Sequence, residues 1–167
     1  MPRRPGPRAT HRLGRTIDGR EVVPVPRYLV VANQTLGSDP LLATIQRLHR
    51  AGPSAFRIVV PLTPPRDHVW TEGEALAVAT DRLDAALQRL RRVGIEADGN
   101  SGDESPMLAI EDAIRDDGPF DAIVLSTLPP RLSRWLKVDL LRRVESAFGL
   151  EVIHVVGDPE RAGTSRR

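Results

Sequence analysis

Short, continuous apolar runs, separated by segments with helical spacing, constrain the fold of this chain more than any other feature. Two segments of this kind, at residues 28–32 and 56–61, are expected to be buried strands, and the apolar segments 122–125 and 151–156 are expected to form two more strands. A strand that is apolar at consecutive positions is buried on both faces, as in a parallel sheet covered by helices. The sequence therefore predicts an α/β fold, because parallel strands need helical crossovers between them.

The segments between these runs have apolar residues at helical spacing. The first expected helix starts with Asp39 as its cap and ends at Gly52, and the second runs from Thr71 to Gly94. The third spans 107–115, and the fourth ends at Gly149. The fourth helix is expected to contain, without interruption, Leu136, Leu140, Leu141, Val144 and Phe148. With this pattern we expect a doubly wound, Rossmann-like sheet of five parallel strands flanked by four helices.

Local signals define several element ends. Thr71 followed by Glu74 matches a capping box, and Ser105-Pro106 matches an N-cap with proline in the first turn. The alternating stretch 95–99 is expected to form a half-exposed edge strand, and the Gly, Asp and Ser residues that follow it are expected to form a turn.

Composition divides the chain into three parts. Residues 1–27 carry seven arginines against two carboxylates and five of the 15 prolines, which predicts a flexible basic arm. Residues 28–156 form the predicted domain, and 157–167 a flexible tail. The chain has no cysteine, which excludes disulfides and thiolate metal sites. No apolar run has membrane-spanning length, so a cytoplasmic protein without membrane contact is expected.

The candidate ligand site lies in two loops that follow the first and fourth strands. In an open parallel sheet, ligands bind beyond the carboxyl ends of the strands, where neighbouring crossovers diverge. Both loops are rich in polar side chains. The candidate pocket residues are Asn33, Gln34, Thr35, Ser38, Ser126, Thr127, Arg131, Ser133, Arg134 and Trp135.

Several strings in this order resemble the universal stress protein family over residues 28–156. They are the strand from Tyr28 to Asn33, Gly102-Asp103 before the third helix, the strand from Asp121 to Ser126, and Leu132-Ser133-Arg134. The resemblance implies a sheet of order 3-2-1-4-5 and a homodimer formed through the last strand. It also implies a regulatory or stress-related binding protein rather than an enzyme.

Nucleotide-binding members of that family carry an aspartate after the first strand. They also carry Gly-x-x-Gly, nine residues and Gly-Ser or Gly-Thr after the fourth. Here the aspartate position is Asn33, and an ungapped alignment places Ser126, Pro129 and Asp139 at the three glycines. A one-residue deletion would instead place Val138-Asp139 at the last pair. Prolines lack the amide donors that hold phosphates, and Asp139 is expected to place negative charge there. We therefore predict a degenerate nucleotide site without a cofactor, with ATP or AMP as the remaining candidates.

Other functions were weighed against this prediction. The four histidines lack metal-ligand spacing, so no metal site is expected. A hydrolase or transferase would require His68, Asp67 and Ser133 to meet, but no nucleophile elbow is recognisable. The alternative function is a ligand-free interaction module whose arginine-rich arm contacts an acidic protein or nucleic acid.

Overall fold

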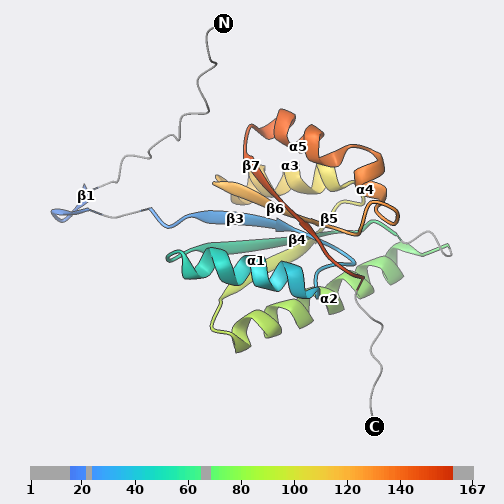
Figure 1. Cartoon of the computed structure of the whole chain (residues 1–167), viewed down its shortest axis with the longest axis horizontal. Helices are drawn as coiled ribbons and strands as arrows, with labels where there is room; N and C mark the ends of the chain where they lie inside the picture. Colours follow the sequence, from blue (N-terminus) through green and yellow to red (C-terminus); the bar gives the residue numbers. More distant parts are fainter. Residues whose placement is uncertain (1–15, 22–23, 65–68, 160–167) are drawn as a thin grey trace, which may run out of the picture.

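The computed structural model describes residues 16–21, 24–64 and 69–159. Its centre is a five-stranded sheet of order β5-β4-β3-β6-β7, in which all neighbouring strands are parallel (Figure 1). This confirms the predicted α/β class and the 3-2-1-4-5 order. The five strands are β3 (Arg27–Val31), β4 (Ala55–Pro61), β5 (Ala97–Gly102), β6 (Ala122–Thr127) and β7 (Glu151–Val156).

Helices cover both faces of the sheet, with α1 and α2 on one side and α3 and α5 on the other (Figure 1). Their bounds are α1 (Asp39–Arg50), α2 (Glu72–Arg92), α3 (Pro106–Asp117), α4 (Arg134–Lys137) and α5 (Leu140–Phe148). Each face has its own apolar core, because alternate residues of the central strands point to opposite faces. Val30 and Val124 pack towards α1 and α2, whereas Leu29 and Ile123 pack towards α3 and α5. None of the helices in the described ranges is long and apolar enough to cross a membrane.

Two of the three predicted helix caps are confirmed. The backbone N–H of Glu74 donates to the Thr71 hydroxyl (3.2 Å), and the Glu74 carboxylate accepts from the Thr71 N–H (2.8 Å), which completes a capping box. Ser105 caps α3, with Pro106 in its first turn. The prediction for α1 was wrong by one residue, because Asp39 is already helical and Ser38 is the N-cap.

The last predicted helix is interrupted. It is divided into α4 and α5 at Asp139, whose backbone is left-handed (φ 55°). The apolar spacing from Leu136 to Val144 continues across this break, which is why the sequence pattern did not reveal it. The four predicted helical segments are therefore present between the strands, but the described chain has five helices.

The edge strand β5 also differs from its prediction. It spans Ala97–Gly102, so the residues expected to form a turn are paired with β4. Gly102, one of the residues expected in the turn, accounts for the difference, because a Cβ added there would lie 2.8 Å from the Ala109 Cβ and 2.9 Å from a Val59 methyl. Glycine at this position permits close packing against β4 and α3, rather than marking a turn.

The flanking segments are partly described. Within the predicted basic arm, β1 (Thr16–Ile17) and β2 (Arg20–Glu21) pair as a short antiparallel hairpin. Its turn is Asp18-Gly19, and both residues have positive φ, as a type I′ hairpin turn requires. Gly157, predicted to begin the loose tail, is buried, and its N–H donates to the Thr127 carbonyl (2.9 Å). Residues 1–15, 22–23 and 160–167 lie outside the described residues.

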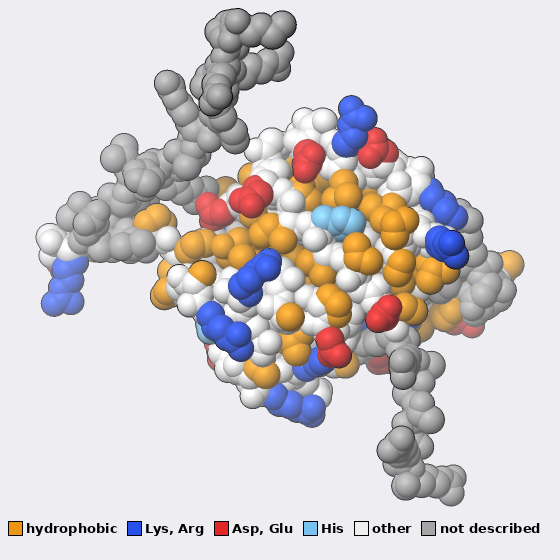
Figure 2. All heavy atoms as spheres, viewed as in Figure 1, with side chains coloured by type: hydrophobic (Ala, Val, Ile, Leu, Met, Phe, Trp, Pro, Cys, Tyr) orange, Lys and Arg blue, Asp and Glu red, His pale blue; other side chains and the backbone are white. Residues whose placement is uncertain are grey.

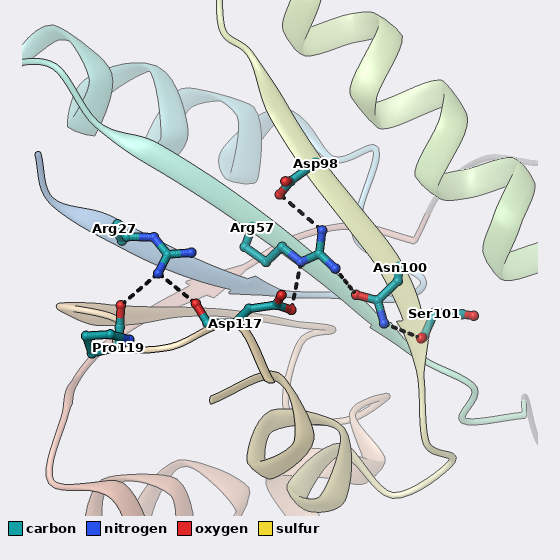
Figure 3. A network of polar contacts seen from close by, with 7 residues as sticks. All are labelled: Arg27, Arg57, Asp98, Asn100, Ser101, Asp117 and Pro119. Atoms are coloured by element: carbon teal, nitrogen blue, oxygen red, sulfur yellow. Dashed lines mark hydrogen bonds and ion pairs between the residues drawn. The ribbon is translucent and has the colours of Figure 1, made fainter. Parts of the chain in front are cut away.

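A polar network connects the amino-terminal ends of the strands (Figure 3). The Arg57 guanidinium on β4 forms ion pairs with Asp98 (3.3 Å) and Asp117 (3.2 Å), and donates to Asn100 (2.9 Å). Arg27 donates to the backbone carbonyls of Asp117 (2.6 Å) and Pro119 (3.2 Å). This network connects β3, β4 and β5 with the end of α3. It lies at the amino-terminal ends of the strands, whereas the candidate site lies at their carboxyl ends.

Candidate functional site

A pocket of about 440 Å³ lies beyond the carboxyl ends of β3 and β6. These two strands are neighbours, and their crossovers lead to opposite faces of the sheet, with α1 after β3 and α4 and α5 after β6. The pocket therefore lies at the topological switch point. All predicted site residues except Ser38 line it. The lining is Asn33, Gln34, Thr35, Thr63, Pro64, Ser126, Thr127, Leu128, Arg131, Leu132, Ser133, Arg134, Trp135, Lys137 and Pro159.

A pair of buried hydroxyls joins the two loops. The Thr35 Oγ1 and Ser126 Oγ atoms lie 2.6 Å apart, and the two residues are only 2% and 1% exposed. One hydroxyl donates to the other, so one O–H proton of the pair has no acceptor among the described residues. The pair therefore joins the loops and retains one donor at the pocket.

Asn33 follows β3 and uses its side chain to hold neighbouring segments together. Its Nδ2 donates to the carbonyl oxygens of Pro61 (2.7 Å) and Thr63 (3.4 Å). Its Oδ1 accepts from the Arg82 guanidinium of α2 (2.6 Å). An amide suits this position better than a carboxylate, because only the amide can donate to the two carbonyls. Asn33 lines the pocket, but its polar atoms are occupied by these contacts.

The loop after β6 turns at its two prolines. The Pro129 carbonyl accepts from the N–H groups of Leu132 (2.8 Å) and Ser133 (3.0 Å). Pro129 and Pro130 have no N–H, and those of Leu132 and Ser133 are directed into the turn. Ser133 then caps α4, with its hydroxyl accepting from the Leu136 N–H (3.2 Å). The loop therefore offers side chains, rather than a row of free backbone amides.

A third segment forms part of the wall, and the sequence prediction did not include it. Thr63 and Pro64 follow β4 and contact the residues that follow β6. The Trp135 indole N–H donates to the Thr63 hydroxyl (3.4 Å), and the Arg134 guanidinium donates to the Pro64 carbonyl (2.9 Å). These contacts span about 70 positions along the chain. The one sequence signal in this segment is its prolines, at 61, 64 and 65.

Ser38 is the one candidate residue that lies outside the pocket lining. It is 7% exposed, and its hydroxyl has no hydrogen-bond partner among the described residues. Its position is explained by packing, because a Cβ added to Gly157 would lie 2.4 Å from the Ser38 Oγ. Ser38 thus contacts the chain leaving β7, next to the pocket rather than within it.

Thr127 connects the pocket lining with the edge strand. Its hydroxyl donates to the Leu128 carbonyl (3.0 Å) and lies 2.8 Å from the His154 Nε2 on β7. The tautomer of His154 decides whether its Nε2 donates or accepts in the second contact. Burial lowers the pKa of His154 below its ordinary value.

The positions of Asp139 and Ser133 bear on two further predictions made from the sequence. Asp139 is not among the residues that line the pocket, so its carboxylate adds no negative charge to the pocket wall, and the charge expected at a phosphate position stays a prediction. Its side chain is 62% exposed and lies 4.0 Å from the Arg142 guanidinium. For the hydrolase alternative, Ser133 lines the pocket, but His68 and Asp67 lie outside the described residues.

In the described ranges, no cluster of three or more His, Asp or Glu side chains could hold a metal ion. The site is therefore a pocket of hydroxyls, amides, cations and apolar side chains.

No protein-family model and no curated protein matches this chain.

Proposed function

We propose that this chain is a regulatory or stress-related binding protein of the universal stress protein type, whose pocket has been modified so that it does not hold ATP in the usual mode. The observation that carries the proposal is the switch-point pocket. It retains polar residues from both loops, whereas a proline turn occupies the place of the glycine-rich loop.

Asp139 supports the relation to the family. In the ungapped alignment it occupies a position where nucleotide-binding members carry glycine, and its φ of 55° is one that glycine adopts readily. A left-handed aspartate at this position is consistent with a backbone conformation that was retained after the glycine was replaced. The ungapped alignment is thereby favoured over the one with a deletion.

The lost nucleotide mode follows from the chemistry of the two loops. Phosphates bind best to several convergent backbone amides, and prolines remove these donors from the turn after β6. At the other loop, the side chain of Asn33 is already bonded to Pro61, Thr63 and Arg82. ATP would therefore have neither the phosphate cradle nor the carboxylate that the family pattern provides.

The homodimer through β7 is part of this proposal. β7 is an edge strand of the sheet, and Val156 at its end is 44% exposed. Figure 2 shows hydrophobic side chains gathered around a histidine, over the region where β7 runs in Figure 1. A second copy pairing along this edge would cover both the free backbone groups and the apolar side chains.

The test combines titration calorimetry with a thermal-shift panel. ATP, AMP and cyclic nucleotides are expected to give no heat of binding, and some small molecule of another class is expected to raise the melting temperature. Micromolar affinity for ATP would refute the proposed loss of the nucleotide mode.

A matched pair of variants determines whether a stabilising compound occupies the pocket. Leu132 lines the pocket and is 59% exposed, whereas Leu108 lies on α3 and is 49% exposed. Leu132→Trp should fill the pocket and abolish the thermal shift, while Leu108→Trp should leave it unchanged.

A ligand-free interaction module is the second candidate, favoured by the seven arginines against two carboxylates in residues 1–27. Binding to an acidic protein or nucleic acid would then decrease steeply with salt. A binding assay with and without residues 1–27 tests this, because binding that is unchanged after truncation would exclude the arm.

A further inference from the structure

Three cationic side chains line the switch-point pocket, and none of the described carboxylates does. They are Arg131, Arg134 and Lys137, all exposed and all on or beside α4. Arg134 donates to the Pro64 carbonyl, but Arg131 and Lys137 make no hydrogen bond or ion pair with any residue that the structure describes. By contrast, Arg57, on β4, is held by two carboxylates. The open side of the pocket therefore attracts an anion.

The buried side of the same pocket is neutral and polar. The hydroxyl pair of Thr35 and Ser126 retains one O–H donor, and it is shielded from solvent. A donor in such a place costs free energy unless a partner accepts from it. An uncharged oxygen atom of a ligand would satisfy it, and half-exposed Gln34 provides an amide beside it.

Apolar surface connects the cationic side with the hydroxyl side. Leu128, Leu132 and Trp135 line this surface, together with Pro64 and Pro159. The Trp135 N–H is already bonded to Thr63, so the rest of the indole can contact a ligand only through apolar atoms. The pocket thus combines a charged end, an apolar middle and a neutral polar end.

We propose that this pocket, taken as the ligand site of the function proposed above, binds a small organic carboxylate with an apolar body. Its carboxylate contacts Arg131 and Lys137, and an oxygen at its other end accepts from the pair of Thr35 and Ser126. A volume of about 440 Å³ suits a single ring with short substituents.

The chemistry of the donors favours a carboxylate over a phosphate. One guanidinium fork satisfies both oxygens of a carboxylate. A phosphate has a third oxygen and more charge, which proteins usually stabilise with backbone amides. The turn at Pro129 and Pro130 does not provide these amides.

The probes are 4-hydroxyphenylacetate, its neutral amide 4-hydroxyphenylacetamide, and phenyl phosphate, each titrated calorimetrically into the full-length protein. The carboxylate is expected to bind about tenfold more tightly than the amide, or about 1.4 kcal/mol. Lys137 is the only lysine of the chain, so reductive ¹³C-methylation places one lysine NMR signal at the pocket. The chemical shift of this signal should change when 4-hydroxyphenylacetate is added, and it should stay the same when buffer alone is added.

Charge variants test the assignment directly. Arg131→Gln and Lys137→Gln should each weaken binding of the carboxylate about fivefold to tenfold, with little change for the amide. Arg47→Gln is the matched control, because Arg47 is an exposed cation on α1 that does not line the pocket.

The outcomes separate this inference from the function on which it rests. Equal affinity for amide and carboxylate, tighter binding of phenyl phosphate, or no binding of the carboxylate would each overturn it. If a neutral compound then stabilises the protein and Leu132→Trp abolishes the effect, the proposed binding function stands without the carboxylate. If none of the three probes binds and no compound of the thermal-shift panel raises the melting temperature, both this inference and the proposed binding function are rejected.

Discussion

Asn33→Asp is the substitution that best tests how the switch point is built. The change replaces the Nδ2 donor with an oxygen that faces the Pro61 carbonyl at 2.7 Å. Leaving that carbonyl without its donor costs about 1–3 kcal/mol. The new carboxylate binds Arg82 more strongly than the amide does, which returns about 1 kcal/mol. We expect a net loss of about 1 kcal/mol in the free energy of unfolding, the middle of the resulting range of about 0–2 kcal/mol.

Urea unfolding followed by circular dichroism measures this loss. With an m-value of about 2 kcal/mol/M, the midpoint should fall by roughly 0.5 M. Asn100→Asp is the matched control, because Asn100 also donates to a carbonyl (Ser101, 2.7 Å) and accepts from an arginine (Arg57), but is exposed. Its midpoint should change by less than about 0.3 M, since water can solvate the new charge. Equal midpoints for the Asn33 variant and the native chain would refute this account of the contacts.

Three further substitutions probe other parts of the chain. Arg57→Met removes the half-buried pair with Asp117 and should cost about 1–2 kcal/mol, seen as a melting temperature a few degrees lower; an unchanged value would contradict the role given to the network. Asp139→Gly removes the strain of a left-handed aspartate but increases the chain entropy of the unfolded state. These effects oppose each other, so the free energy of unfolding should change by no more than about 0.5 kcal/mol. Asp139→Val should lower the free energy of unfolding by at least about 1 kcal/mol in the same urea assay, because valine does not tolerate a left-handed backbone. Because the pKa of His154 is lowered in the folded state, the unfolded state binds more protons as pH falls below about 6.5, so stability should decrease with falling pH. His154→Gln, which can still form a hydrogen bond with Thr127, should flatten that pH dependence, and an equally steep profile would exclude this origin.

The sheet and most site positions could be predicted because they depend on local patterns. Continuous apolar runs specified the buried strands, and parallel strands bring the loops after β3 and β6 to one edge. Contacts between distant segments could not be predicted in this way. Arg82 reaches Asn33 across 49 positions, and no spacing rule connects the two.

Two local predictions were wrong: the turn expected after residue 99 and the uninterrupted last helix. Gly102 was interpreted as part of a turn, but it lies in β5, where glycine is required because the strand packs against Val59 and α3. The amphipathic pattern of the last helix continues through Asp139, so only the backbone reveals the break. Patterns record which side chains are buried, and not how closely two backbones approach.

The opposite placement of the Arg57 network and the pocket has a consequence for how this protein can vary. The two groups lie at the amino and carboxyl ends of the same strands, which at about 3.3 Å per residue separates them by roughly 15–20 Å. Free-energy effects of substitutions that far apart, without shared partners, usually add. Substitutions at the switch point can therefore change ligand preference without weakening the stabilising contacts of the Arg57 network at the amino-terminal ends of the strands. The same separation makes the two regions suitable for independent engineering.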